Sequence, residues 1–321
     1  MYPTDIYSIF NVGKIVAGID SVHAIKDFVA EYNLKTALIN TDQGVWNTGL
    51  VDRPQELLDG AKIEKNGVPT LMIPTTAGTG SEATQNAIFL VPETESKVGI
   101  VSSKLVPNWA ILDPRLTVGL PPAITASTGM DALCHAIECY ISKKANPLSD
   151  TYALRAISLI SRSLRRAFLN GGDLDARHDM LLAALFGGMC IASSSTTAVH
   201  ALAYPLGGKY HMPHGLSNAI LLPHVMKFNL DATEEKFQEI AVAMGIPVEG
   251  LSTREAAEKM IENLFSLMHD LKINMSLQDK GIAAADLDGM VEAASKVTRL
   301  LNNNPKPMSK EDIRSIYLKL M

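Results

Sequence analysis

The chain has 321 residues, 47% hydrophobic and 20% charged, and at about 100 to 200 residues per domain this length predicts two domains. The formal net charge is -5 and no Lys/Arg run occurs, so the sequence lacks the basic surface that a nucleic-acid-binding protein needs. Three cysteines, Cys134, Cys139 and Cys190, form no C-x-x-C pair and indicate neither a disulfide framework nor a thiolate zinc site. Without a signal-like start or an apolar run of about 18 residues, we expect a cytoplasmic protein with no membrane span.

In the first 120 residues, a helical pattern and short apolar runs are separated by turn residues, which is typical of an α/β domain. Apolar residues at helical spacing predict a helix over 22–32. Short apolar runs predict strands at 36–40, 69–74, 87–91, 97–101 and 109–112. Thr75 to Glu82 form a loop of small residues, a kind that lets backbone N–H groups approach a ligand. Turn residues at 113–114 and 121–122 end this half.

Residues 121–321 carry Ala, Leu, Met and Ile at helical spacing, which predicts a mostly helical second domain. Helices are expected over 150–169, 254–269, 285–297 and 310–320. The first of them should bury Tyr152, Leu154, Ile157, Ile160 and Leu164. The predicted architecture is an α/β domain over residues 1–120 followed by an all-α domain over residues 121–321.

Asp131 and His135 lie four residues apart in GMDALCHAIECY, so on a helix both side chains can reach one ion. Alone, this spacing is more often a surface feature than a ligand pair. Three further histidines, His200, His211 and His214, follow in VHALAYPLGGKYHMPHG. A continuous helix is interrupted there by Pro205, Gly207, Gly208 and Pro213. Two or three histidines with one carboxylate suit Fe(II), Zn(II), Mn(II) or Co(II), and the lack of thiolate argues against a structural zinc site.

Three segments closely resemble the iron-containing (group III) alcohol dehydrogenase family: PTTAGTGSEAT at 74–84, TGMDALCHAIECYIS at 128–142 and HALAYPLGGKYHMPHGLSNAILLPHVMKFN at 200–229. The resemblance extends weakly toward both ends and covers nearly the whole chain. It implies a Rossmann-like dinucleotide-binding domain, a helical domain and a divalent metal in the cleft between them. It also implies NAD(P)-linked oxidation of alcohols and reduction of aldehydes.

Carried over from these motifs, the metal ligands are Asp131, His135, His200 and His214, binding Fe(II), with zinc or manganese as alternatives. Such a cation would polarise the substrate oxygen and favour hydride release to the nicotinamide. His211 either lines the cleft near the nicotinamide or has a structural role. The remaining histidines are interpreted as packed at a helix terminus (His224) or as surface residues (His23, His178 and His269).

The resemblance also assigns a cofactor side. It places Asp42 against the adenosine ribose, where a carboxylate repels a 2′-phosphate and favours NAD over NADP; a turn or helix-cap role is the equal alternative. Ile88 would pack near the cofactor and Lys97 near the nicotinamide ribose, although Lys97 alone reads as a solvated lysine. The residues that would lie along the cofactor are Thr75, Thr76, Ala77, Gly78 and Thr79.

The sequence departs from the family pattern in two places. The glycine-rich G-G-G-S loop that receives the pyrophosphate is absent, and the 26 residues between Asp42 and Pro69 are too few for two strand-and-helix units of about 30 residues. A segment is therefore missing near residues 61–62, through an internal deletion or an incomplete sequence. Tyr204 stands where many members carry a proton-relaying histidine. With an ordinary pKa of about 10 it is a poorer relay near neutral pH, so either His211 provides the route or the substrates differ.

We therefore predict an NAD-dependent, metal-containing alcohol dehydrogenase for a small primary alcohol or diol and its aldehyde, working as a homo-oligomer, a dimer. Two alternatives stay open. The missing phosphate loop favours a non-redox metalloprotein or pseudoenzyme. A metal-dependent hydrolase or lyase is also possible, because three histidines and an aspartate are not unique to oxidoreductases.

Overall fold

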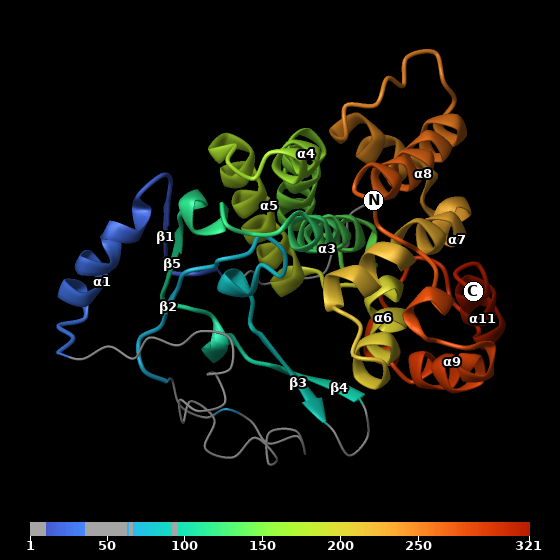
Figure 1. Cartoon of the computed structure of the whole chain (residues 1–321), viewed down its shortest axis with the longest axis horizontal. Coiled ribbons are helices and arrows are strands. Elements are labelled where there is room, and N and C mark those ends of the chain that lie inside the picture. The colour runs from blue at the N-terminus through green and yellow to red at the C-terminus, as the bar shows by residue number, and fades with distance from the viewer. Residues whose placement is uncertain (1–10, 36–62, 64–66, 92–95) are drawn as a thin grey trace.

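The computed structural model of the chain describes residues 11–35, 63, 67–91 and 96–321 (Figure 1). The predicted strand at 36–40 and the candidate ribose ligand Asp42 lie outside these residues. A small parallel sheet and a hairpin make up the N-terminal part, and helices make up the C-terminal part. The predicted order, α/β structure followed by an all-α region, is confirmed.

The parallel sheet has the strand order β1 (Lys14–Ala17), β5 (Trp109–Leu112), β2 (Leu71–Met72). All four residues of β5 are buried, because this strand is central and pairs on both sides. The sequence did not indicate β1, since three of its four residues are exposed and give no buried run. The strand expected at 69–74 is reduced to the two residues of β2.

An antiparallel hairpin joins β3 (Asn86–Val91) to β4 (Ser96–Val101), each within one residue of its predicted bounds. The helix predicted at 22–32 is divided into a 3-10 turn (Ser21–Ala24) and α1 (Ile25–Glu31). Phe28 packs edge-on against Trp109 with 5.6 Å between ring centroids, which holds α1 on the sheet. Further 3-10 turns lie at Ser81–Ala83, Ser103–Leu105, Pro114–Thr117, Gln278–Lys280 and Ala284–Asp286.

The helical part begins with α3 (Pro122–Ile141), which lies against α4, α5 and α7 in the interior (Figure 1). Every residue of α3 from 129 to 141 is buried as a result. The helices after α3 are α4 (Pro147–Leu169), α5 (Leu174–Ser193), α6 (Ala198–Lys209), α7 (His214–Ala243), α8 (Thr253–Asp270), α9 (Leu287–Ser295), α10 (Thr298–Leu301) and α11 (Lys310–Leu318).

α4 begins three residues before its predicted start. Asn146 and Ser149 form a reciprocal capping box there, and Pro147 occupies the first turn, where its missing N–H costs nothing. The predicted buried face is correct at its centre, because Ile157, Ile160 and Leu164 are fully buried. Tyr152 and Leu154 are partly buried at the edge of the same face.

The break between α6 and α7 lies later than the sequence suggested. Pro205 and both glycines, Gly207 and Gly208, are inside α6, which ends only at Lys209. The chain turns at 210–213, where His211 has a left-handed φ of 52°, and α7 begins directly after Pro213. The tail helices expected at 254–269, 285–297 and 310–320 are present as α8, α9 and α11.

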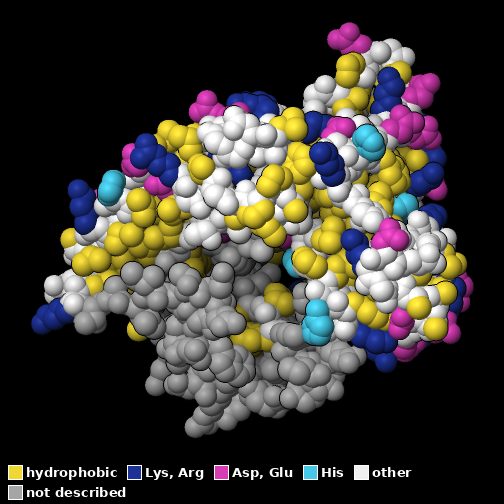
Figure 2. All heavy atoms as spheres, viewed as in Figure 1, with side chains coloured by type: hydrophobic (Ala, Val, Ile, Leu, Met, Phe, Trp, Pro, Cys, Tyr) yellow, Lys and Arg dark blue, Asp and Glu magenta, His cyan; other side chains and the backbone are white. Residues whose placement is uncertain are grey.

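Within the described ranges, no single helix is long and apolar enough to cross a membrane. Only α5 and α6 taken together have the length and apolar composition of a membrane span, and this pair is bent by 104° at the break between the two helices. Most residues of both helices are buried inside the fold. On the face shown in Figure 2, basic and acidic side chains are interspersed over the helical part, so neither sign dominates there.

Candidate metal centre

Three helices bring four potential ligands together. α3 carries Asp131 and His135 one turn apart, α6 carries His200, and α7 begins with His214. One ligand atom from each residue lies within 4.8 Å of the other three. The Nε2 atoms of His135 and His200 are 2.9 Å apart. Asp131 Oδ1 lies 3.9 Å from His135 Nε2 and 3.8 Å from His214 Nε2, so the four residues selected from the sequence share one site.

The chemistry of this donor set fits a divalent cation. Asp131, His135 and His200 are at most 4% exposed, whereas the side chain of His214 is 32% exposed. Lone-pair donors that converge in a buried space repel one another unless a cation or shared protons lie between them. Three imidazoles, one carboxylate and no thiolate suit Fe(II), Zn(II) or Mn(II). Because the His214 side chain is partly exposed, the cluster is partly open to solvent on this side.

Glu138 fixes the orientation of His200. It lies on the ligand-bearing face of α3, is completely buried, and accepts a hydrogen bond from His200 Nδ1. Its other oxygen accepts hydrogen bonds from Thr197 Oγ1 at 2.6 Å and from the backbone N–H of Val199 at 2.7 Å. Because Nδ1 carries the proton, Nε2 of His200 keeps its lone pair and faces the cluster.

Asn218 contacts three of the four candidate ligands. It lies one turn after His214 on α7, and its amide nitrogen is 2.7 Å from Asp131 Oδ1. The same nitrogen is 3.1 Å from His200 Nε2 and 3.2 Å from His214 Nε2. These contacts hold the ligand geometry together, and they compete with a cation for the same lone pairs.

Gly215 allows α7 to approach α3. A Cβ at this position would lie 2.4 Å from the backbone oxygen of Ser127 and 3.2 Å from Asp131 Cβ. Any larger residue would therefore push the start of α7 away from α3. The glycine places His214 beside Asp131.

The protonation states expected at neutral pH are those that metal binding requires. Burial raises the pKa of Asp131, but the three histidines and Asn218 outweigh burial and hold this pKa below its ordinary value. Burial lowers the pKa of His135 by more than the charge of Asp131 raises it. Asp131 is therefore an anion and His135 a neutral imidazole.

Two family models match the sequence. The C-terminal model of the Fe-containing alcohol dehydrogenase family matches residues 125–321, which include all four candidate ligands. The model for iron-containing alcohol dehydrogenases matches residues 57–114. The chain belongs to the Fe-containing alcohol dehydrogenase family. The resemblance carried by the three sequence motifs is thereby confirmed.

Members of this family with assigned activities align over most of the chain. A 1,3-propanediol dehydrogenase from Klebsiella pneumoniae is 46% identical over 249 residues, which are 78% of this chain and 64% of that protein. An NAD-dependent methanol dehydrogenase from Bacillus methanolicus is 37% identical over 254 residues, 79% of this chain and 66% of that protein. The chain thus covers slightly less than two thirds of each of these relatives. The crystal structure of a 1,3-propanediol oxidoreductase superposes with a TM-score of 0.90 and 33% identity, over 99% of this chain and 100% of that one.

The family's small-residue loop is packed onto two helices. A Cβ at Gly78 would lie 2.8 Å from Thr128 Cβ on α3, and a Cβ at Gly80 would lie 2.3 Å from the backbone oxygen of Ala184 on α5. Gly80 also has a φ of +60°, which favours glycine. These contacts fix the loop beside α3, one turn before Asp131.

The candidate cofactor residues differ in exposure. In the loop, Thr75 and Thr79 are exposed, Thr76 is half-buried, and Ala77 and Gly78 are buried. On the hairpin, the side chain of Ile88 is 46% exposed. Lys97 lies in β4, but its side chain is outside the described part, as is Asp42. The cofactor assignment of all these residues stays a prediction.

The two candidate catalytic residues lie near the ligands in sequence but outside the cluster. Tyr204 follows His200 by one turn on α6 and is half-buried; burial raises its pKa, and Arg299 opposes the increase. A tyrosine with a raised pKa is a poor proton relay near neutral pH. His211 is exposed in the turn before α7. The relay role of both residues stays a prediction.

His224 does not lie at a helix terminus as expected. α7 continues through Pro223 to Ala243, so His224 is inside the helix. It packs edge-on against Phe265 of α8 with 5.2 Å between ring centroids, and burial lowers its pKa to about 4. His23 and His269 are exposed and His178 is partly exposed, apart from the cluster.

Sequence reasoning missed Glu138 and Asn218. A signal was present for Glu138, which follows Asp131 by seven residues and His135 by three and so shares their face of α3. Asn218 follows His214 by four residues, the same spacing that linked Asp131 to His135. A search for polar residues at helical spacing from each ligand would have found both.

Proposed function

We propose that the chain is a metal-dependent, NAD-linked alcohol dehydrogenase that interconverts a small primary alcohol or diol and its aldehyde. The observation that carries this proposal is the cluster of Asp131, His135, His200 and His214, in which Glu138 orients one imidazole. Membership in the family and the activities named for its relatives support alcohol oxidation.

The four ligands would hold a divalent cation, which supplies a Lewis acid for the substrate oxygen. Asp131 contributes the negative charge of the site, and Glu138 keeps the His200 proton on Nδ1, away from the cluster. The partly exposed side at His214 admits the substrate. We propose Fe(II) as the resident metal, with zinc or manganese as substitutes that the same donors can bind.

The proposed cofactor is NAD, which supplies the hydride acceptor. Residues 1–120 would form the dinucleotide-binding unit and residues 121–321 the metal-binding unit. The cofactor would lie along the loop at 75–79 and near Ile88 and Lys97, with Asp42 disfavouring the 2′-phosphate of NADP. The name of the NAD-dependent methanol dehydrogenase supports this choice of nucleotide.

Proton release, cellular location and assembly complete the proposal. Tyr204 would donate a hydrogen bond within the cleft, and His211 would pass the proton to solvent. A cytoplasmic location is supported by three buried cysteines that form no disulfide. We propose a homodimer, which light scattering on the purified chain would check.

Turnover with defined metals tests the function. The chain loaded with Fe(II), Zn(II) or Mn(II) should reduce NAD with short alcohols and diols, measured at the NADH absorbance band. His200→Ala should abolish this activity and His269→Ala, at an exposed position, should retain it. Failure of every metal with a broad alcohol panel would contradict the proposal.

A second candidate, a metal-binding protein without redox activity, is favoured by the absence of the glycine-rich phosphate loop from the sequence. This candidate predicts metal retention without NAD binding. Calorimetry of the metal-loaded chain with NAD distinguishes the two, because heat of binding that saturates with NAD would exclude the pseudoenzyme.

A further inference from the structure

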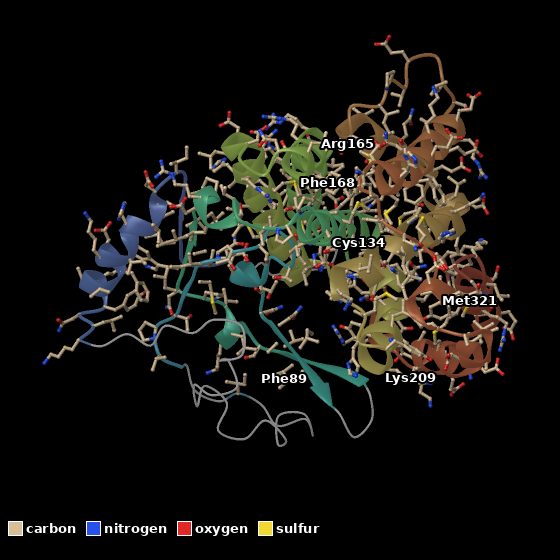
Figure 3. The ribbon with its side chains drawn as sticks, in the orientation of Figure 1. Phe89, Cys134, Arg165, Phe168, Lys209 and Met321 are labelled. Carbon is tan, nitrogen blue, oxygen red and sulfur yellow. The ribbon has the colours of Figure 1, made fainter. Side chains whose placement is uncertain are left out.

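Arg299 lies where three elements meet. It belongs to α10, which contacts α6, and α6 in turn contacts β4 of the hairpin. Figure 3 shows this region, with Phe89 marking the hairpin and Lys209 marking the end of α6. The cation therefore lies between the helix that carries His200 and the hairpin assigned to the cofactor side.

The guanidinium rests against a glycine of the hairpin. Arg299 Nη2 is 3.4 Å from the position that a Cβ would occupy on Gly99. Gly99 pairs with Ile88 across the hairpin, and the Ile88 side chain is 46% exposed on this strand. The backbone of Arg299 is also fixed, because Asn303 Nδ2 donates a hydrogen bond to its carbonyl oxygen at 3.0 Å.

Tyr204 connects Arg299 to the metal centre. Its position one turn after His200 puts the two side chains on one face of α6. Arg299 lies close enough to the Tyr204 hydroxyl to lower its pKa through its charge and a hydrogen bond, and the charge of Glu138 acts on the same hydroxyl in the opposite direction. The Arg299 guanidinium therefore lies within reach of a hydroxyl that is one helical turn from His200.

Arg299 is exposed and lacks an ion-pair partner among the described residues. Five other arginines of the helical part pair with carboxylates, namely Arg162, Arg165, Arg166, Arg254 and Arg314. Among the described residues, Arg155 and Arg177 do not, but neither of them lies beside α6. A guanidinium presents N–H donors in a fork that matches a carboxylate. The Arg299 guanidinium contacts the Tyr204 phenol rather than a carboxylate, so its remaining N–H donors are suited to bind the charged end of a substrate.

We propose that Arg299 binds the carboxylate of an anionic substrate, so that the enzyme prefers ω-hydroxy acids and their aldehydes to neutral alcohols. This inference rests on the proposed function, because the hydroxyl end must face the metal ligands. The Tyr204 hydroxyl would donate a second hydrogen bond to the same carboxylate.

A substrate carboxylate fits the position better than a cofactor phosphate. Tyr204 follows His200 by four positions on α6, a rise of about 6 Å along the helix, so a short carbon chain can join the two. The small-residue loop assigned to the cofactor lies instead against α3 and α5. We therefore assign Arg299 to the substrate.

A binding experiment tests the assignment without turnover. Calorimetry would measure butyrate and 1-butanol binding to the metal-loaded chain and to Arg299→Leu, Arg299→Lys and Arg155→Leu, the last removing an exposed arginine of α4. Arg299→Leu should weaken butyrate binding at least about tenfold, because hydrogen bonds between charged partners are among the stronger ones in proteins. Arg299→Lys should weaken it less, and Arg155→Leu should not change it. Equal butyrate affinity in the wild type and Arg299→Leu would overturn the proposal.

Kinetics separate the substrate from the cofactor. For 4-hydroxybutyrate, Arg299→Leu should raise KM at least tenfold, while KM for 1,4-butanediol and for NAD stays within twofold. A rise in KM for NAD with an unchanged KM for the hydroxy acid would show that Arg299 serves a cofactor phosphate, and would overturn the assignment. If no alcohol is oxidised yet butyrate binding depends on Arg299, the proposed function fails and the carboxylate site stands.

Discussion

Glu138 determines which nitrogen of His200 is free to bind a cation. The four candidate ligands could be predicted because the family motifs contain them. Glu138 and Asn218 could not, because their hydrogen bonds join α3 to α6 and α7, and the distance between helices is not visible in one sequence. Helical periodicity shows which residues share a face but not what that face meets.

Glu138→Gln should weaken metal binding by about 10- to 100-fold, the usual cost of losing a carboxylate that orients a ligating histidine. The amide can still fill the space, so the fold should remain. Competition of the metal-loaded chain with a chelator measures the change. Glu262→Gln, an exposed position on α8, is the control, and equal affinities in both variants would show that Glu138 does not orient the ligand.

His224 should make the metal-free chain less stable in acid. Its pKa is about 4 in the folded state and about 6.5 when unfolded, so the unfolded state takes up the proton first as the pH falls. The stability of the fold that depends on a neutral His224 is therefore fully present above pH 6.5 and is lost as the pH falls toward 4. Urea unfolding measures the free energy of unfolding at pH 7 and at pH 5. Between these two values, His224→Gln should lose about 1 to 2 kcal/mol less of this free energy than the wild type, after allowance for partial solvent screening. Equal losses would contradict the assigned burial effect.

Elements with a clear apolar pattern were more predictable than short or exposed ones, and β3, β4 and β5 lie within one residue of their predicted bounds. The periodicity of α4, α8 and α11 repeats over several turns and gave bounds close to the observed ones, whereas β1 and β2 are short and carry little pattern. The end of α6 was misplaced because Pro205 and two glycines are tolerated inside a buried helix whose neighbours hold it in place. Tertiary contacts, which the sequence does not display, decided the position of that break.

The approach of α7 to α3 should depend on Gly215. Gly215→Ala should cost about 1 to 3 kcal/mol of unfolding free energy by overpacking, and it should weaken metal binding because His214 moves with the helix. Gly289→Ala, in α9 with open space around its Cβ, is the matched control and should be neutral or stabilising by up to about 1 kcal/mol. Urea unfolding and metal titration of both variants check this, and unchanged metal affinity in Gly215→Ala would contradict the role given to α7.

At the scale of the whole molecule, the sequence provides all four candidate metal ligands but lacks one motif expected for dinucleotide binding. All four ligands lie within residues 125–321, which the family's C-terminal model matches. The sequence lacks the glycine-rich loop whose N–H groups receive the pyrophosphate in the family. We therefore expect the chain to bind the metal well and NAD weakly.

NAD should bind at least about tenfold more weakly to this chain than to the NAD-dependent methanol dehydrogenase of Bacillus methanolicus, because this sequence lacks the glycine-rich loop expected to donate backbone hydrogen bonds to the pyrophosphate. Calorimetry on both metal-loaded proteins under one set of conditions makes the comparison. Equal dissociation constants would show that another segment, such as the loop at 75–80, receives the pyrophosphate.

Metal content tests the central claim most directly. The chain is loaded anaerobically with Fe(II), desalted and measured by elemental mass spectrometry beside His200→Ala and His269→Ala. One iron per chain is expected in the wild type and in His269→Ala, and a large loss is expected in His200→Ala. Retention of one iron per chain by His200→Ala would contradict the assignment of Asp131, His135, His200 and His214 as the metal centre.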